Sequence, residues 1–274
     1  MINNTYEIEA NGQTAKLVTY IRSQAHLKEE RPWPLVLVLP GGGYLEVVQR
    51  EAEPIACAFL AEEFHTAVLH YSVAPNRFPT ALIQVAKAIA LIKEHADEWN
   101  VDPDNIFVTG YSAGGHLAAS IGVFWNRDFL LKASLLTAEQ TRPAGLVLAY
   151  PVISAVHSPH AGSFRNLLGE DFGNEEKMSF VSLETQVTKD TPPTFIWSTV
   201  TDAVVPVENT LSFANALRAN GVDFEMHVYP RGPHGLALVT PDTLETGNAD
   251  ELRNIADWPK HAAHFIRLIS GEKK

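Results

Sequence analysis

The sequence predicts an α/β protein with a mostly parallel central sheet that helices cover on both faces. The first observation is that continuous apolar runs, rich in Val, Ile and Leu, alternate with longer segments of helical spacing. The second is that such alternation builds units whose strands run parallel. The third is that the 274 residues contain no internal repeat, low-complexity tract or linker. We therefore expect one domain over residues 1–274.

The first third of the chain predicts a hairpin followed by alternating strands and helices. Asn11-Gly12 stands between two strand-like runs and is a strong short-range hairpin signal. The apolar run 35–40 is typical of a strand buried on both faces, and three glycines follow it. The remaining elements expected here are a helix over 52–64, a strand over 66–73 and a helix over 81–98.

The rest of the chain continues the same alternation. A turn at Asp102-Pro103-Asp104-Asn105 precedes a short strand that ends at Gly110, and a helix follows over 113–125. Further apolar segments predict strands over 144–153, 191–200 and 223–230. Two more helices are expected over 209–221, which ends in glycine, and over 258–270, which has proline in its first turn.

The segment 155–191 is long, polar and weakly periodic. A loop of this length inside a compact domain is typically a lid or a binding insertion with some helix of its own. We therefore expect a cap-like insertion here. Ligands of open parallel sheets bind beyond the carboxyl ends of the strands, so functional residues are sought in the loops that follow strands.

Charge and hydropathy exclude several classes of protein. The formal net charge is −11 and there is no cluster of Lys or Arg, which disfavours nucleic acids and anionic membrane surfaces as partners. No run of about 18 apolar residues exists, so no membrane span is expected. The N-terminal residues lack the basic and apolar regions of a secretory signal, so we expect a cytoplasmic protein. The single cysteine, Cys57, lies in an apolar run, and we expect a buried, inert thiol.

Ser112 is the candidate nucleophile. It is the centre of Gly110-Tyr111-Ser112-Ala113-Gly114, which matches G-x-S-x-G and lies between a predicted strand and a predicted helix. In that context the sharp turn exposes the serine above the sheet at a helix N-terminus, where free N–H groups favour negative charge. An acyl-transfer intermediate develops such a charge on its oxygen, whereas a plain glycine-rich turn would give the serine no role.

The three glycines after the strand 35–40 are the candidate oxyanion hole. Glycines let a backbone approach a ligand closely and direct successive N–H groups at it. The loop lacks the lysine and Ser/Thr of a phosphate-binding P-loop, and it lacks a G-x-G-x-x-G frame. We expect donors from Gly42, Gly43 and Ala113, each worth about 3 kcal/mol to the transition state.

Asp202 and His234 are the candidate acid and base. Each follows a predicted strand, so both are expected at the same sheet edge as Ser112. A serine hydroxyl is a weak nucleophile that needs an imidazole as base, and a carboxylate orients that imidazole. Asp190 and Asp223 precede their strands and would lie at the wrong edge.

The other histidines of note are expected to have no catalytic role. His116 should point away from the Ser112 hydroxyl, and His227 should lie in the core or on a sheet face. His261 and His264 share a helix face, but no nearby carboxylate or cysteine completes a metal set. Two more are placed in the insertion as parts of a solvated loop: His157 and His160.

These motifs resemble those of the α/β-hydrolase superfamily, particularly its hormone-sensitive-lipase-like carboxylesterases and the acetyl (xylan) esterase relatives of lactic acid bacteria. The resemblance covers most of the chain and is carried by LPGGGY, VDPDNIFVTGYSAGGHLAA, WSTVTDAVVPVENTLSFANAL and YPRGPHGLAL. It implies that Ser112, Asp202 and His234 act as nucleophile, acid and base. Pro40 departs from the pattern, because it replaces the histidine that orders the glycine loop in HGGG. Tyr44, beside this loop, is expected to line the pocket.

The resemblance also implies a function. It indicates a serine esterase that forms an acyl-enzyme, uses no cofactor or metal, and acts on short acyl esters, often acetyl groups on sugars or xylo-oligosaccharides. It further implies frequent oligomers. Two alternatives stay open: the same triad acting on amides, as in a peptidase or formamidase, and a non-catalytic binding protein that kept the fold. The presence of all three triad candidates disfavours the second.

Overall fold

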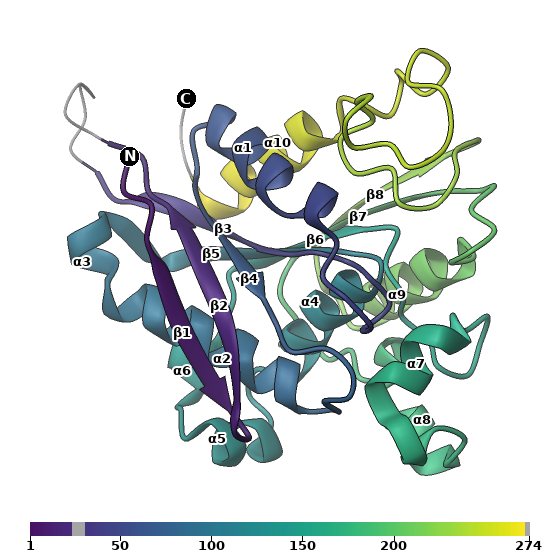
Figure 1. Cartoon of the computed structure of the whole chain (residues 1–274), viewed down its shortest axis with the longest axis horizontal. Coiled ribbons are helices and arrows are strands. Elements are labelled where there is room, and N and C mark those ends of the chain that lie inside the picture. Colours follow the sequence, from purple (N-terminus) through teal and green to yellow (C-terminus); the bar gives the residue numbers. More distant parts are fainter. Residues whose placement is uncertain (24–30, 272–274) are drawn as a thin grey trace.

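A single mostly parallel sheet forms the centre of the molecule (Figure 1). The structure is a computed structural model that describes residues 1–23 and 31–271. Within these ranges eight strands pair in the order β1-β2-β4-β3-β5-β6-β7-β8. The strands from β4 to β8 in this order run parallel, whereas β2 pairs antiparallel with β4 and with β1. The strands are β1 (Thr5–Ala10), β2 (Gln13–Tyr20), β3 (Trp33–Leu39), β4 (His65–His70), β5 (Val101–Tyr111), β6 (Gly145–Ala149), β7 (Thr194–Thr199) and β8 (Phe224–Tyr229).

The predicted N-terminal hairpin is confirmed. Strands β1 and β2 are joined by Asn11 and Gly12, and the pair nearest the turn is Ala10 with Gln13. Both turn residues have positive φ, 50° and 72°, as a two-residue turn with the right twist for a hairpin requires.

Helices cover both faces of the sheet, as the alternating sequence predicted. In Figure 1, α1 and α10 lie on one face, and α2, α4 and α9 lie on the other. The helices are α1 (Glu53–Ala61), α2 (Thr80–Glu94), α3 (Ala96–Trp99), α4 (Ala113–Phe124), α5 (Asp128–Ser134), α6 (Ala138–Thr141), α7 (Ala161–Leu168), α8 (Glu175–Phe180), α9 (Glu208–Ala219) and α10 (Trp258–Ser270).

Strand β3 shows why the apolar runs are continuous. Leu35, Leu37 and Leu39 pack into the core that contains α2 and α4, whereas Val36 and Val38 pack into the core that contains α1 and α10. Side chains alternate between the two faces of a strand, so a strand covered on both sides needs apolar residues at every position. Burying each such side chain stabilises the fold by about 2 kcal/mol.

The structure departs from the sequence prediction at two places. The turn expected at residues 102–105 lies inside β5, which already starts at Val101 and pairs there with Trp33. The carboxylate of Asp102 accepts hydrogen bonds from Asp104 N and from Asn105 Nδ2, so these residues bulge out while their flanks stay paired with β3. The short helices α5 and α6 were not predicted at all.

The expectation that Cys57 is buried is wrong. Helix α1 turns Ile55, Ala56 and Phe59 toward the core, and position 57 therefore falls on the outer face, where the cysteine is exposed. Partial desolvation and then the carboxylate of Glu53 raise the pKa of its thiol. This rise further favours the thiol form, which already predominates at neutral pH.

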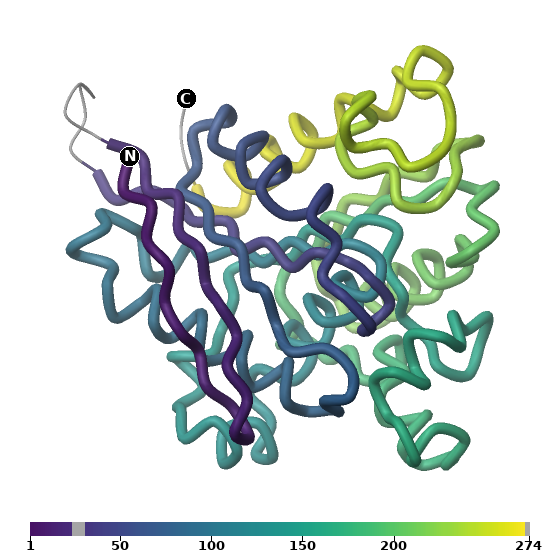
Figure 2. Tube along the Cα trace, in the orientation of Figure 1, coloured from purple at the N-terminus to yellow at the C-terminus, as the bar shows by residue number. Residues whose placement is uncertain are grey.

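The long segments after β6 and β8 lie at the end of the sheet opposite the N-terminal hairpin, as the chain trace of Figure 2 shows. Segment 155–191 contains helix of its own, as expected, in the form of α7, α8 and two short 3-10 turns, Gly169–Asp171 and Leu183–Thr185. Among the described residues, no helix combines the length and apolar character that crossing a bilayer requires.

Candidate active site

Ser112 lies at the sharp turn between β5 and α4. Its φ is 52°, in the left-handed region that non-glycine residues rarely adopt, and it is 8% exposed. The flanking glycines are required by close packing. A Cβ on Gly110 would lie 2.2 Å from the carbonyl oxygen of Gly114, and a Cβ on Gly114 would lie 2.1 Å from that of Leu39. The two outer positions of G-x-S-x-G must therefore be glycine, because the turn packs against the backbone of α4 and β3 and leaves no space for a Cβ atom.

The structure brings the three predicted side chains into one hydrogen-bonded chain. His234 Nε2 lies 2.8 Å from Ser112 Oγ, and His234 Nδ1 lies 2.6 Å from Asp202 Oδ2. Because an ionised carboxylate only accepts hydrogen bonds, Nδ1 carries the proton and Nε2 accepts from the serine hydroxyl. This tautomer is the one in which imidazole can take a proton from the serine.

Asp202 and His234 reach Ser112 because all three residues follow the carboxyl ends of parallel strands, which lie on the same side of the molecule. Asp202 follows β7, and its Oδ1 accepts hydrogen bonds from the backbone N–H groups of Val204 and Val205, both at 2.9 Å. His234 follows β8, the neighbouring strand. The carboxylate is 1% exposed and its position is set by its own loop.

The glycine loop, which contains Gly41, Gly42 and Gly43 and follows β3, lies beside the serine. A Cβ on Gly41 would stand 3.1 Å from that of Ser112. Among the described residues, no acceptor is found for the backbone N–H groups of Gly42, Gly43 and Ala113. These three groups are thus available to an oxygen bound above Ser112.

A tyrosine and a glutamate order this loop, in which Pro40 occupies the position of the usual histidine. The hydroxyl of Tyr71 donates to the Pro40 carbonyl at 2.6 Å, and the carboxylate of Glu51 accepts from Gly41 N–H at 2.9 Å. No local motif marks Tyr71 or Glu51, so the sequence did not single them out.

The expectation that Tyr44 lines the pocket is wrong. Its side chain is buried, and its hydroxyl lies 2.9 Å from Nδ1 of His116, whose Nε2 donates to the Val181 carbonyl. His116 points away from the serine, as expected. Burial lowers the pKa of His116 to about 4, so its ring is neutral.

His160 is not part of a solvated loop, contrary to expectation. It is half-buried and forms the N-cap of α7, where its Nδ1 accepts from the backbone N–H of Ser163. Burial lowers its pKa, and the neighbouring His234 lowers it further. Helix α7 borders the glycine loop, because Asn166 Nδ2 donates to the Gly43 carbonyl at 2.9 Å. His157 is exposed.

The acids and the histidine that were expected to lie outside the site are placed as predicted. Asp190 and Asp223 precede β7 and β8 and are far from the carboxyl ends of these strands. His227 lies on a face of β8, where its Nε2 is 2.7 Å from Glu225 and its ring stacks on His261. In the part of the chain that the structure describes, no group of three or more His, Cys, Asp or Glu could hold a metal ion.

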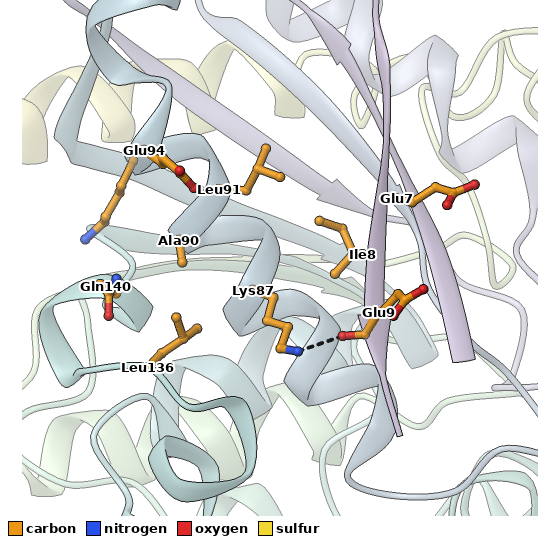
Figure 3. A pocket seen from close by; sticks show the side chains of 10 residues that line it. Glu7, Ile8, Glu9, Lys87, Ala90, Leu91, Glu94, Leu136 and Gln140 are labelled. Carbon is orange, nitrogen blue, oxygen red and sulfur yellow. Dashed lines mark hydrogen bonds between the residues drawn. The ribbon is translucent and has the colours of Figure 1, made fainter. Parts of the chain in front are cut away.

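A separate hollow of about 760 Å³ lies at the hairpin edge of the sheet (Figure 3). Side chains of β1 and α2 line it, and Lys87 Nζ donates there to the carbonyl oxygen of Glu9. Strand β1 is four strands from β5, a separation of about 19 Å, so this hollow is not part of the Ser112 site.

A mostly parallel sheet with a strained serine between strand and helix, and with an acid and a histidine in later loops at the same edge, defines the α/β-hydrolase class. The chain belongs to the BD-FAE family, whose model matches residues 23–217. This match includes Ser112 and Asp202 and ends before His234. The resemblance inferred from the motifs is confirmed.

Relatives agree with this assignment. The chain is 36% identical to an acetyl ester-xyloside bifunctional hydrolase from Caldicellulosiruptor lactoaceticus, with a TM-score of 0.79 over 95% of this chain and 90% of the other. A carboxylesterase from Lactobacillus plantarum WCFS1 is 27% identical, with a TM-score of 0.85 over 97% of each chain. Endo-1,4-beta-xylanase B of Butyrivibrio fibrisolvens is 35% identical over 87% of this chain but only 37% of its own length. The chain spans less than half the length of the first curated relatives that it matches.

Proposed function

We propose that the chain is a serine carboxylesterase that hydrolyses short-chain acyl esters, above all acetyl esters of sugars or xylo-oligosaccharides. The observation that carries this proposal is the hydrogen-bonded series Ser112–His234–Asp202 beside a glycine loop with unpaired N–H groups. The geometry supports nucleophilic catalysis, since hydroxyl and base are already within hydrogen-bond distance.

Acylation starts when Ser112 Oγ attacks the ester carbonyl carbon and its proton passes to His234 Nε2. The carbonyl π electrons move to oxygen, and the resulting oxyanion accepts hydrogen bonds from the N–H groups of Gly42, Gly43 and Ala113. Asp202 stabilises the imidazolium through its 2.6 Å contact with Nδ1. Collapse of the intermediate breaks the bond to the alcohol oxygen, which takes the proton from Nε2 and leaves.

Deacylation repeats these steps with water. His234 Nε2 removes a proton from the water, whose oxygen attacks the acyl-enzyme carbonyl. The second intermediate uses the same three N–H donors. When it collapses, Ser112 Oγ leaves, regains its proton from Nε2, and the carboxylic acid is released.

The substrate class is supported by relatives and by the segment 155–191. One relative named above is an acetyl ester-xyloside hydrolase, and another is a xylanase. In this chain α7 borders the glycine loop and places polar groups there: Ser163 Oγ would lie 3.9 Å from a Cβ on Gly43. We infer that the segment acts as a small cap over a hydrophilic alcohol group.

Hydrolysis of p-nitrophenyl acetate, p-nitrophenyl octanoate and acetylated xylo-oligosaccharides tests the proposal, with formyl and aminoacyl anilides measured beside them. We expect the acetate to exceed the octanoate in kcat/KM and the anilides to be poor substrates. Ser112→Ala should lower kcat by about 10⁴-fold or more and abolish labelling by a fluorophosphonate. Ser23→Ala, at an exposed position, is the control. Undiminished turnover in Ser112→Ala would overturn the proposal.

A cytoplasmic location and a homo-oligomeric state stay predictions. Light scattering of the purified chain measures the second directly.

A further inference from the structure

A buried glutamate contacts the glycine loop directly and is connected, through Tyr150 and Arg50, to the loop that carries His234. Glu51 lies in the short 3-10 turn Gln49–Glu51 after the glycine loop and is 2% exposed. Its Oε2 accepts from Gly41 N–H at 2.9 Å, and its Oε1 accepts from the Tyr150 hydroxyl at 2.9 Å. The carboxylate packs tightly on the loop, because a Cβ on Gly41 would lie 2.6 Å from Oε2.

Tyr150 extends this contact to the loop of the base. Its hydroxyl donates to Glu51 and accepts from the backbone N–H of Ala237 at 2.9 Å. Its ring stands edge-on to the imidazole of His234, with 5.1 Å between ring centroids. Burial, followed by the charge of Glu51, raises the pKa of Tyr150 well above its usual value, so the hydroxyl remains a donor.

Arg50 makes a second connection between the same two loops. Its Nη1 lies 3.5 Å from Glu51 Oε1 and also donates to the carbonyl oxygen of Gly235, the residue after the base. Arg50 and Tyr150 therefore join Glu51 to both residues that bracket the turn after His234, namely Gly235 and Ala237.

The carboxylate of Glu51 is buried, and its need for hydrogen-bond donors explains the contacts that surround it. A carboxylate removed from water must receive hydrogen bonds, and Gly41, Tyr150 and Arg50 supply them. The donors of Gly41 and Tyr150, which are both buried, are fixed in return, because leaving a buried donor without its acceptor costs about 1–3 kcal/mol. Since Gly41 N–H is committed to Glu51, the N–H groups of Gly42 and Gly43 remain for substrate.

We propose that Glu51 is a positioning residue that holds the glycine loop and the His234 loop in register, so that oxyanion donors and base act on the same carbonyl. This inference rests on the proposed esterase function. Glu51 does not touch the reacting atoms. In this chain, which has Pro40 in place of the usual histidine, Glu51 and Tyr71 order the glycine loop instead.

The test compares Glu51→Ala, Glu51→Gln and Tyr150→Phe with the wild type in the hydrolysis of p-nitrophenyl acetate. Glu53→Gln is the matched control, because Glu53 is exposed and lies two residues away in the same segment. The readouts are kcat, KM and the affinity for a trifluoromethyl ketone, which binds as an adduct of Ser112 and mimics the oxyanion. Thermal unfolding of each variant shows whether it is folded.

We expect kcat of Glu51→Ala to fall about 100-fold with little change in KM, since displacement of a donor by about 1 Å has effects of this size. Affinity for the ketone should fall in parallel. Glu51→Gln keeps the chain length and one acceptor oxygen, so it should lose only about tenfold, and Tyr150→Phe should behave similarly. The control should match the wild type.

Each outcome separates this inference from the proposed function. If the wild type hydrolyses the ester but Glu51→Ala keeps its kcat and ketone affinity, only the inference is overturned, even if the melting temperature falls. If Glu51→Ala does not fold, wild-type kcat in both Glu51→Gln and Tyr150→Phe overturns it as well. A wild type without esterase activity overturns both.

Discussion

At the residue scale, both oxygens of Asp202 are committed to different partners. Oδ1 accepts from the backbone N–H groups of Val204 and Val205, and Oδ2 accepts from His234 Nδ1. An asparagine at this position would have to keep its carbonyl oxygen on the two N–H groups. Its NH₂ group would then face Nδ1 and donate to it, which moves the imidazole proton to Nε2.

We predict that Asp202→Asn lowers kcat by about 10⁴-fold, because an Nε2 that carries a proton cannot take one from Ser112. The structure of the variant should stay intact. Steady-state kinetics with p-nitrophenyl acetate checks this, with far-ultraviolet circular dichroism as a test of folding.

Asp223→Asn is the control for this prediction. That acid is exposed and precedes β8, at the opposite end of the strands from His234. A loss below tenfold in Asp202→Asn would show that the imidazole keeps its tautomer without the carboxylate.

The sequence allows a role to be proposed for a single residue only where a local pattern marks that residue. Ser112 lies in a five-residue motif, and Asp202 and His234 each follow a predicted strand, so all three could be proposed from the sequence. Glu51 and Tyr150 have no such mark. Their importance comes from contacts between segments far apart in the chain, such as the contact between Tyr150 and Ala237.

At the scale of elements, the glycines of α4 decide how closely this helix packs on the sheet. All twelve of its residues are buried. A Cβ on Gly114 would meet backbone, 2.1 Å from Leu39 O and 2.3 Å from Pro40 O. A Cβ on Gly122 would meet only the side chain of Leu146, 2.5 Å from its Cδ1. A side chain can change its rotamer, whereas a strand end cannot move without disturbing the site.

We therefore predict that Gly114→Ala lowers the free energy of unfolding by about 3 kcal/mol or more and also removes activity. Gly122→Ala should cost less than about 2 kcal/mol, because its overpacking is partly offset by the better helix propensity of alanine. Urea denaturation of both variants gives the comparison. Equal losses would contradict the view that α4 is held against backbone at its N-terminus.

Elements were predicted well where a single pattern ran through the whole segment. The hairpin, the central strands and the long helices follow from their periodicity and from glycine or proline at their ends. Helix α6 was missed although Thr137 and Gln140 form a capping box at its start. The bulge within β5 could not be predicted, since it depends on pairing with β3 on both sides of Asp102.

At the scale of the whole molecule, His116 joins three regions. Its ring contacts Tyr44 of the glycine loop and the Val181 carbonyl of the segment 155–191, and it belongs to α4. Burial lowers its pKa to about 4 in the folded protein, against about 6.5 in the unfolded chain. Between these pH values the unfolded chain binds a proton that the folded protein does not.

The free energy of unfolding should therefore fall as pH drops from 6.5 to about 4, and His116 should contribute roughly 3 kcal/mol of that loss. His116→Gln keeps an amide donor and acceptor but has no titrating group, so its stability should depend less steeply on pH in this window. Urea denaturation at several pH values measures both slopes. His65, whose burial also lowers its pKa to about 4, continues to titrate in the variant. Equal slopes would contradict the prediction.

The sequence by itself determined the α/β class, the order of the main elements, the family resemblance and the three residues proposed for the triad. These are local properties: periodicity, turn residues and a motif at a strand end. Only the tertiary structure decided that Cys57 faces outward, that Tyr44 is buried against His116, that His160 caps α7 near the site, and that Glu51 ties two distant loops together. The physical reason is that burial and hydrogen-bond partners are set by packing between segments, which the spacing of residues along a single segment does not specify.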